Sequence, residues 1–307
     1  MCGIVGLLLK KPALRPRLGE LMLPPMLIGM TERGRDSAGM AVFTEPVADG
    51  RCKLSLYSGG GAAGARFDWA ALETQLKTSC DPQAQLAPKV NHAVLTIAKP
   101  VAEVKAWLKE YAKDHATGVQ VLSSGHAIDL YKDVGLPADI ARRYDFDTLS
   151  GSHLVGHTRM ATESAVTVEN AHPYTAGLDW CLVHNGSLSN PYQLRRELEP
   201  LGIEFDGDCD TEAACRYLEW RMREGDDLEA ALHRGFEVFD GFFTFLMGTH
   251  DKLALVRDPF ACKPAIVAET DDYVAIASEF RSLAHLPDVK HAQLFEPKPE
   301  HIYSWSI

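Results

Sequence analysis

Short apolar runs, each bounded by turn-forming residues, lie near both ends of the chain and constrain its fold more than any other feature. Runs of this kind are typical of β-strands, and several contain so few polar residues that we expect both strand faces to be buried. The predicted strands are Gly3–Leu9, Ala38–Phe43, Leu154–Thr158, Trp180–His184, Phe242–Thr249, Lys252–Arg257, Pro264–Glu269 and Tyr273–Ser278. Because short turns separate the last four runs, we expect these four to pair as one antiparallel meander.

Helical periodicity appears in three segments between these runs, namely Pro191–Glu199, Thr211–Arg223 and Leu228–Phe239. In the second segment, Ala214 and Leu218 recur at helical spacing with other apolar residues, so one helix face should pack on a sheet. The pattern predicts an α+β fold in which helices cover antiparallel sheets.

The pattern changes between residues 45 and 150, which we interpret as a region inserted into a single domain of residues 1–307. Gly59-Gly60-Gly61 marks a turning stretch, and the polar, proline-bearing segment Asp81–Lys89 is typical of a connector. A small α+β lobe is expected at about residues 89–148. Its predicted elements are Ala93–Ala98, Val119–Ser123 and Ile128–Tyr131 as strands, and Ala102–Lys113 and Pro137–Tyr144 as helices.

Charge and cysteine content exclude several classes of protein. The net charge of -11 argues against a nucleic-acid partner, because nucleic-acid binders gather Lys and Arg on one face. No apolar run reaches the length of a membrane span, and residues 1–11 lack the features of a secretory signal, so we expect a cytoplasmic protein without a membrane partner. The seven cysteines include no Cys-x-x-Cys pair, so neither a disulfide framework nor a metal cluster is indicated.

Cys2 is the first candidate for chemistry, because removal of Met1 would place its thiol beside a free α-amine. An α-amine titrates near neutrality and can take the thiol proton directly or through one water, which turns a weak nucleophile into a strong one. The alternative is that a Met-Cys start has no chemical role and that the apolar residues after it form an edge strand. Cys2 alone does not decide between these interpretations.

Cys2 belongs to the first of eight short motifs that occur in order along the chain. They are Cys2-Gly3-Ile4-Val5-Gly6, Arg33-Gly34-Arg35-Asp36-Ser37-Ala38-Gly39, Gly156-His157-Thr158-Arg159-Met160-Ala161-Thr162, Asn170-Ala171-His172-Pro173, His184-Asn185-Gly186, Asp208-Cys209-Asp210-Thr211-Glu212, Arg257-Asp258-Pro259-Phe260 and Ala277-Ser278-Glu279. Their order and content resemble the class II glutamine amidotransferases. The resemblance covers nearly the whole chain apart from the insertion, and it implies a four-layer αββα sandwich of the N-terminal nucleophile hydrolase type.

Hydrolysis of a carboxamide passes through a tetrahedral oxyanion, which needs fixed hydrogen-bond donors. The resemblance gives this role to Asn185, through its side-chain amide, and to Gly186, whose backbone N–H can approach closely because no Cβ intervenes. The residues alone favour a different interpretation, in which His184-Asn185-Gly186 is a turn at the end of a strand.

A free glutamine carries a carboxylate and an ammonium group, and the resemblance assigns a partner to each. Arg159 would bind the carboxylate through its planar guanidinium, and Asp210 would pair with the ammonium. The structural alternatives are a surface arginine at a strand end and an N-cap for the following helix. Thr162 lies where the family's substrate-covering loop begins and is a further expected contact.

Supporting positions complete the expected site. By resemblance, Arg33 helps to order the nucleophile's end of the site and His184 is a further supporting residue, whereas Asp36 and Ser37 are expected to cap backbone groups. The histidines at 157, 172 and 184 lack the spacing of a metal site, and the family has no catalytic metal, so we expect none.

The resemblance also implies a consumer for the released ammonia. No phosphate-binding loop or flavin-binding region is recognisable, so we expect a separate synthase subunit and no cofactor in this chain. The long insertion and the segment 257–264 look most like the glutaminase subunit of glutamate synthase-like systems, particularly N-methylglutamate synthase, in which a partner subunit bears the flavin. Two alternatives stay open: a stand-alone N-terminal nucleophile amidase acting on γ-glutamyl or other amides, and a non-catalytic regulatory subunit.

Overall fold

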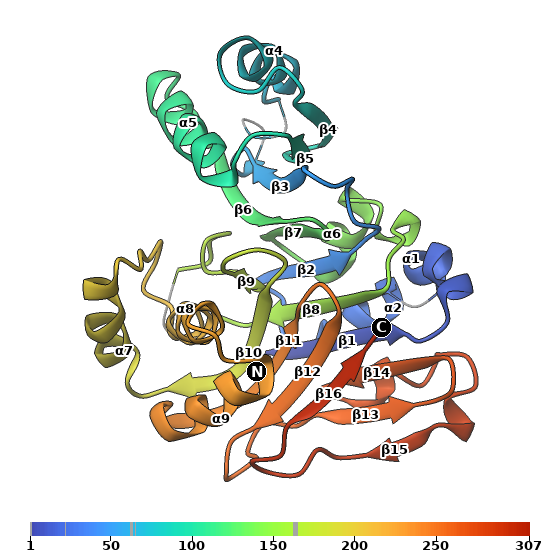
Figure 1. The fold of residues 1–307 in the computed structure, drawn as a ribbon. Coiled ribbons are helices and arrows are strands. Elements are labelled where there is room, and N and C mark those ends of the chain that lie inside the picture. The colour runs from blue at the N-terminus through green and yellow to red at the C-terminus, as the bar shows by residue number, and fades with distance from the viewer. Residues whose placement is uncertain (1, 22, 62–63, 65, 162–164) are drawn as a thin grey trace.

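A computed structural model of the protein describes residues 2–21, 23–61, 64, 66–161 and 165–307. Two antiparallel sheets stack face to face, and helices cover the outer face of each (Figure 1). The larger sheet has seven strands, in the spatial order β15 (Gln293–Phe295), β13 (Ile266–Glu269), β14 (Tyr273–Ala277), β1 (Gly3–Leu9), β8 (His153–Arg159), β2 (Ser37–Phe43) and β7 (Ile128–Val134). The second sheet has five, in the order β16 (Tyr303–Ser306), β12 (Lys252–Arg257), β11 (Gly241–Gly248), β10 (Cys181–Leu188) and β9 (Tyr174–Thr175).

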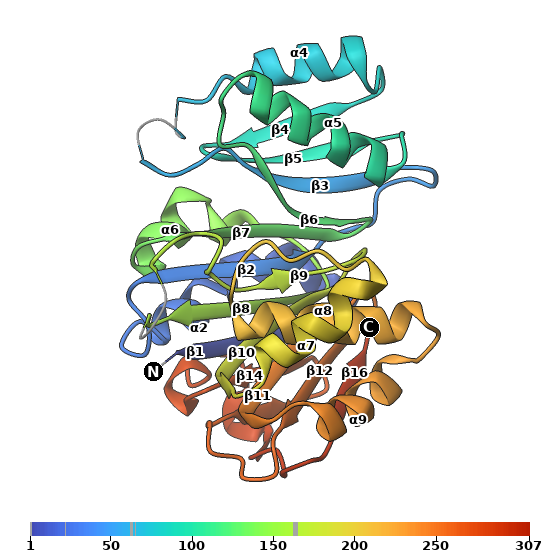
Figure 2. The same ribbon diagram turned by 90° about the vertical axis from the view of Figure 1, so that its left-hand side faces the viewer.

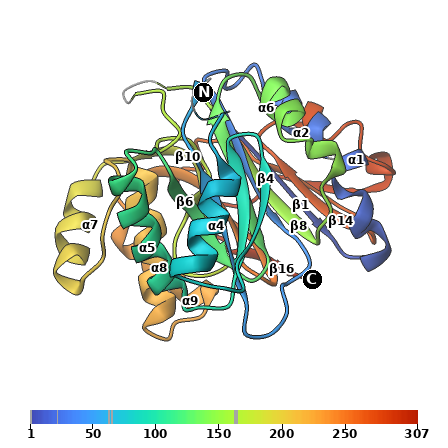
Figure 3. The same cartoon turned by 90° about the horizontal axis from the view of Figure 1, so that it is seen from above.

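Two groups of helices form the outer layers, on opposite sides of the strands (Figure 3). The larger sheet is covered by η1 (Pro12–Arg17), α1 (Leu18–Leu21), α2 (Leu23–Gly29), α6 (Pro137–Arg143), η2 (Phe146–Thr148), η4 (Phe280–Ser282) and η5 (Val289–His291). The five-stranded sheet is covered by α7 (Pro191–Leu198), η3 (Glu199–Leu201), α8 (Asp210–Arg223) and α9 (Leu228–Val238). The predicted αββα sandwich is therefore confirmed.

Side chains of β1 alternate between two cores, as the two-residue period of a strand requires. Ile4 and Leu8 point between the two sheets, where they meet residues such as Val183 and Leu246 of the facing sheet. Leu7 and its alternate neighbours point to the opposite face, under the helices. Every residue of β1 is buried, so the strand that begins directly after Cys2 lies in the middle of the sandwich.

The last four predicted strands exist, but they do not form one meander. β11 pairs with β12 in the five-stranded sheet, whereas β13 pairs with β14 in the seven-stranded sheet, so the chain changes sheet between residues 258 and 265. Asp258 explains the change, because its carboxylate accepts hydrogen bonds from the backbone N–H groups of Phe243 and Phe260 and holds the chain in a turn that leaves the sheet. The turn residues in this segment therefore mark a crossover and not a hairpin.

The inserted lobe stands on one edge of the sandwich (Figure 2). Its sheet has the order β4 (Gln85–Lys89), β5 (His92–Ile97), β3 (Cys52–Tyr57) and β6 (Gln120–Gly125), and α4 (Trp69–Ser79) and α5 (Val101–Asp114) share an apolar core with one face of it. These strands begin at residue 52 and end at residue 125, which differs from the expected bounds of 89–148 at both ends.

Two predicted parts of the lobe belong to the sandwich. The strand expected at Ile128–Tyr131 is β7, which pairs along the whole of β2, and α6 packs beside β2 and α2. Both segments are apolar on one face, and that pattern alone does not tell which neighbour covers them. The expected connector Asp81–Lys89 contains the edge strand β4. Among the described residues, no helix combines the length and apolar character needed to cross a membrane.

Candidate active site

Cys2 lies at the entry to β1, and two side chains hold its backbone carbonyl. Arg33 Nε donates to this oxygen across 2.8 Å, and Asn185 Nδ2 donates to it across 3.1 Å. The Cys2 thiol lies 3.8 Å from the carbonyl oxygen of Met160, which directly follows β8. Arg33 and Asn185 were predicted to share a site with Cys2, and the fold brings them beside it from a loop and from β10.

Arg33 is itself fixed by an ion pair that the sequence analysis did not predict. Its guanidinium is buried and lies 2.9 Å from Glu279, which also pairs with Arg281 at 2.8 Å. The neighbouring Ser278 accepts a hydrogen bond from the N–H of Ile4 across 2.9 Å. The sequence did contain a signal for this contact, because the segment Ala277-Ser278-Glu279 is one of the family motifs. Its role follows only from the pairing of β14 with β1, which places the segment beside Cys2.

Gly186 follows Asn185 on β10 and has a backbone conformation that favours glycine, with φ of +153°. A Cβ at this position would lie 2.0 Å from the carbonyl oxygen of Phe242 and 2.6 Å from Nε2 of His184. The residue must therefore be glycine, whichever role its N–H has.

Arg159 is the last residue of β8, and its side chain is buried. The antiparallel register pairs Gly3 with Thr158, which places Arg159 opposite the Cys2 end of β1. Its guanidinium donates to the carbonyl of Ala165 across 3.3 Å. The interpretation of Arg159 as a surface residue is thus wrong. Thr162, the other expected contact in this segment, lies outside the described residues.

Asp210 is the first residue of α8, whose N-cap position is Cys209, so the N-cap interpretation of Asp210 is wrong. Its carboxylate accepts hydrogen bonds from the N–H groups of Leu188 (2.9 Å) and Thr211 (2.7 Å) and lies 3.7 Å from Nδ1 of His184. Burial opposes ionisation, but the charge of a protonated His184 and these N–H donors outweigh it and lower the pKa of Asp210. With a lowered pKa, Asp210 is ionised near pH 7, and burial lowers the pKa of the neighbouring His184.

Residues 157–285 match a family model described as a glutamine amidotransferase domain. The chain is also 48% identical over 306 residues to the glutamine amidotransferase-like protein GlxB of Rhizobium meliloti strain 1021, covering 99% of this chain and 98% of that one. A relative from Methanothermobacter thermautotrophicus strain Delta H, named as a glutamine amidotransferase, is 30% identical over 307 residues, and the match covers 99% of each chain. The chain belongs to the class II glutamine amidotransferases.

The fold agrees with this family. A solved structure of the glutamine phosphoribosylpyrophosphate amidotransferase of B. subtilis, complexed with ADP and GMP, superposes with a TM-score of 0.56 at 18% sequence identity. The superposition covers 99% of this chain and 49% of that one, so this amidotransferase chain corresponds to about half of that protein.

Behind the candidate site, three buried imidazoles of this amidotransferase form a connected cluster. The rings of His157 and His172 contact each other at a tilt, with their centres 4.1 Å apart, and Thr211 Oγ1 forms hydrogen bonds with His172 Nε2 (2.9 Å) and His184 Nδ1 (3.0 Å). Burial lowers the pKa of His157 to about 3 and lowers that of His172 well below its usual value. The described residues include no group of His, Cys, Asp or Glu arranged to hold a metal ion. Through Thr211, these imidazoles link α8 to the strands of both sheets.

Proposed function

We propose that this amidotransferase hydrolyses L-glutamine to glutamate and ammonia through a thioester on Cys2. The contact that carries the proposal is the double restraint of the Cys2 carbonyl by Arg33 and Asn185. That restraint fixes the nucleophile's backbone next to a strand buried along its whole length. Precise placement of a nucleophile is a large part of catalysis, because the reacting atoms must start about 3–3.5 Å apart.

The proposed reaction begins when removal of Met1 frees the α-amine of Cys2. The thiol sulfur attacks the side-chain carbonyl carbon of glutamine, and the α-amine takes the thiol proton and passes it to the departing ammonia. Water then hydrolyses the thioester and releases glutamate. The oxyanion formed in each step is stabilised by the N–H of Gly186 and by the amide hydrogen of Asn185 that does not bind Cys2.

Arg159 and Asp210 give the site its preference for free glutamine. A buried guanidinium at the Cys2 end of β8 is suited to a carboxylate, and an ionised carboxylate at the start of α8 is suited to an ammonium group. Burial strengthens both interactions, since fewer water molecules compete for the charges. Thr162 contributes a further contact from the substrate-covering loop.

The ammonia passes to a separate synthase subunit in the cytoplasm. This part of the proposal rests on the resemblance of the insertion and of segment 257–264 to glutaminase subunits of glutamate synthase-like systems, with N-methylglutamate synthase as the particular assignment. The partner subunit bears the flavin, and this chain holds no cofactor. Co-purification from the native host, followed by a flavin absorption spectrum of the complex, tests this step.

The chemical proposal is tested with Cys2→Ala and Cys2→Ser. Both variants should retain the circular dichroism of the wild-type chain and lose glutamine hydrolysis, and mass spectrometry of the active wild-type protein should show that Met1 is absent. Undiminished hydrolysis by Cys2→Ala, or full activity with Met1 retained, would refute the proposal. Equal rates on γ-glutamyl peptides and free glutamine would instead support a stand-alone amidase.

A further inference from the structure

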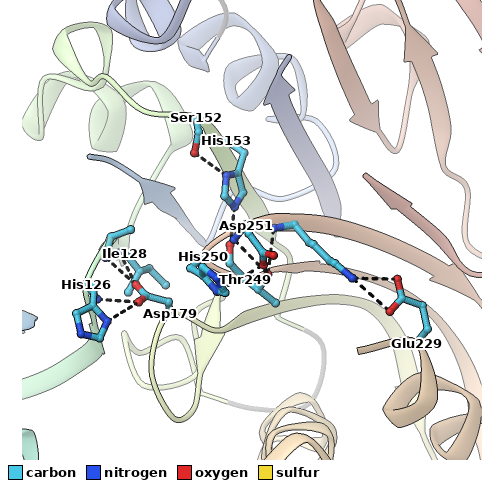
Figure 4. Close-up of polar contacts among 11 residues, drawn as sticks. His126, Ile128, Ser152, His153, Asp179, Glu229, Thr249, His250 and Asp251 are labelled. Atoms are coloured by element: carbon cyan, nitrogen blue, oxygen red, sulfur yellow. Dashed lines mark hydrogen bonds and ion pairs between the residues drawn. The ribbon is translucent and has the colours of Figure 1, made fainter. Parts of the chain in front are cut away.

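Three side chains at the base of the lobe form a chain of contacts remote from Cys2. Cys52 Sγ lies 3.5 Å from Nε2 of His126, and His126 Nδ1 lies 3.3 Å from the carboxylate of Asp179. Figure 4 shows the imidazole of His126 directed at Asp179. A thiol, an imidazole and a carboxylate in this order are the components of a nucleophile activated by an oriented base.

The position of the three residues in the fold is as informative as the distances. Cys52 is the first residue of β3, which leads the chain into the lobe, and His126 lies in the turn between β6 and β7, which leads it out. Asp179 belongs to the sandwich and precedes β10. The contacts therefore join both lobe connections to the main body. They lie beside the Phe43 end of β2, about 20 Å along the strand from the Ser37 end near Cys2.

Asp179 is held rigidly and is positioned to orient the imidazole. It is 5% exposed, and its two oxygens accept hydrogen bonds from the N–H groups of His126 (2.7 Å), Ala127 (2.8 Å) and Ile128 (2.9 Å). Gly125 makes room for it, because a Cβ there would lie 2.2 Å from Oδ1 of Asp179. With the carboxylate fixed, the proton of the imidazole belongs on Nδ1, and the lone pair on Nε2 faces the sulfur.

Cys52 rests as a thiol in this arrangement, since burial and the nearby charge of Asp179 raise its pKa. A thiol at rest needs a base at the moment of attack, and Nε2 of His126 is the neighbouring acceptor. The side chain of His126 is 47% exposed and that of Cys52 is partly exposed, so a small reagent can reach the sulfur. Cys262 is exposed and provides a reference thiol in the same chain.

We propose that Cys52, His126 and Asp179 form a second thiol–imidazole–carboxylate relay, which makes Cys52 a modification site for small hydroperoxides. The sulfur attacks the terminal oxygen of the peroxide while His126 accepts the thiol proton. The O–O bond breaks, an S–O bond forms, and the imidazolium returns the proton to the leaving oxygen as water or an alcohol. The sulfur is oxidised to a sulfenic acid, and the peroxide is reduced.

The experiment exposes the full-length protein to hydrogen peroxide, traps sulfenic acids with dimedone and measures each cysteine separately by mass spectrometry. At pH 7, Cys52 should be labelled at least about tenfold faster than Cys262, a lower bound for assistance by a general base.

His126→Gln is the decisive variant, because it keeps Cys52 and its exposure but removes the base. Labelling of Cys52 in this variant should fall at least about tenfold, to or below the rate of Cys262, with unchanged circular dichroism. Glutamine hydrolysis should be unaffected by His126→Gln and by Cys52→Ser, so the result is independent of the proposed function. Labelling of Cys52 that is no faster than that of Cys262, or that is unchanged in His126→Gln, would overturn the proposal.

Discussion

The side-chain amide of Asn185 donates a hydrogen bond to the backbone carbonyl of Cys2 across 3.1 Å, which links the two stacked sheets at the entry to β1. Only one of the two amide hydrogens is needed for this bond. In the proposed reaction, Asn185 would both hold Cys2 in place and donate to an oxyanion formed beside it.

Asn185→Ala should lower kcat for glutamine by about 100- to 1000-fold, the usual cost of losing one oxyanion donor, and should change KM little. Steady-state kinetics measure both constants. Ser187→Ala is the matched control, because Ser187 is exposed two residues further along the same strand, and it should have nearly wild-type kinetics. A less than threefold loss of kcat in Asn185→Ala would contradict the assigned role.

Arg159→Lys and Asp210→Asn should raise KM for glutamine by roughly 10- to 100-fold, because each change weakens a charge-assisted bond to the amino acid head group. The two variants should differ in their response to modified substrates. With glutamine whose α-amine is acetylated, Asp210→Asn should have the same KM as the wild-type protein. Arg159→Lys should still have a higher KM than the wild-type protein. An unchanged KM in both variants would show that neither residue binds the substrate.

Glu279→Gln should reduce kcat by roughly two- to fivefold with little change in KM, since the partly exposed ion pair to Arg33 is worth up to about 1 kcal/mol. Glu279 acts as a positioning residue, through Arg33 and the Cys2 carbonyl. Arg281→Gln removes the other partner of Glu279 without touching Arg33 and should leave kcat unchanged. Equal effects of the two substitutions would indicate a general surface effect.

Gly186→Ala should destabilise the fold by more than the cost of placing alanine at a positive φ, because the new methyl group also clashes with the Phe242 carbonyl. Gly202→Ala is the matched control, since Gly202 has φ of +79° and open space around its Cα. Urea unfolding should give a loss of about 1 kcal/mol for Gly202→Ala and a larger loss for Gly186→Ala. Similar values for both would exclude the steric argument.

Acidification should destabilise the protein through its buried imidazoles. The pKa of His157 is about 3 in the folded chain, whereas an unfolded histidine titrates near about 6.5, so between these values only the unfolded chain binds the proton. Stability is complete above about pH 6.5 and falls by about 1.4 kcal/mol per pH unit for each such imidazole as the pH decreases. Urea unfolding at pH 7.5 and 5.5 measures the loss. The exposed His250→Gln should not alter the pH dependence, whereas His157→Gln should reduce it.

Local patterns in the sequence were sufficient to predict where the individual strands lie, but not which strands pair with one another. The run Gly3–Leu9 is β1 to the residue, because apolar side chains on both faces require a central strand. The same reasoning joined the run Lys252–Arg257 to Pro264–Glu269, although β12 and β13 lie in different sheets. Pairing depends on which distant strand supplies a neighbour, and a turn between two runs does not encode that choice.

In the candidate site, too, the sequence predicted which residues take part but not the contacts that hold them. Ordered motifs indicated Cys2, Arg159 and Asn185, because the chemistry requires those residue types. The ion pair of Arg33 with Glu279 depends on two segments that are 246 residues apart, and the hydrogen bonds of Thr211 depend on the docking of α8. Such contacts are set by tertiary packing.

The place of β1 in its sheet has a consequence for biosynthesis. Its two neighbours are β8 and β14, and β14 ends only at Ala277. During synthesis, β1 therefore lacks one of its two permanent neighbours until β14, far later in the chain, has been translated. The surroundings of Cys2, at the entry to this strand, are therefore completed only late in synthesis.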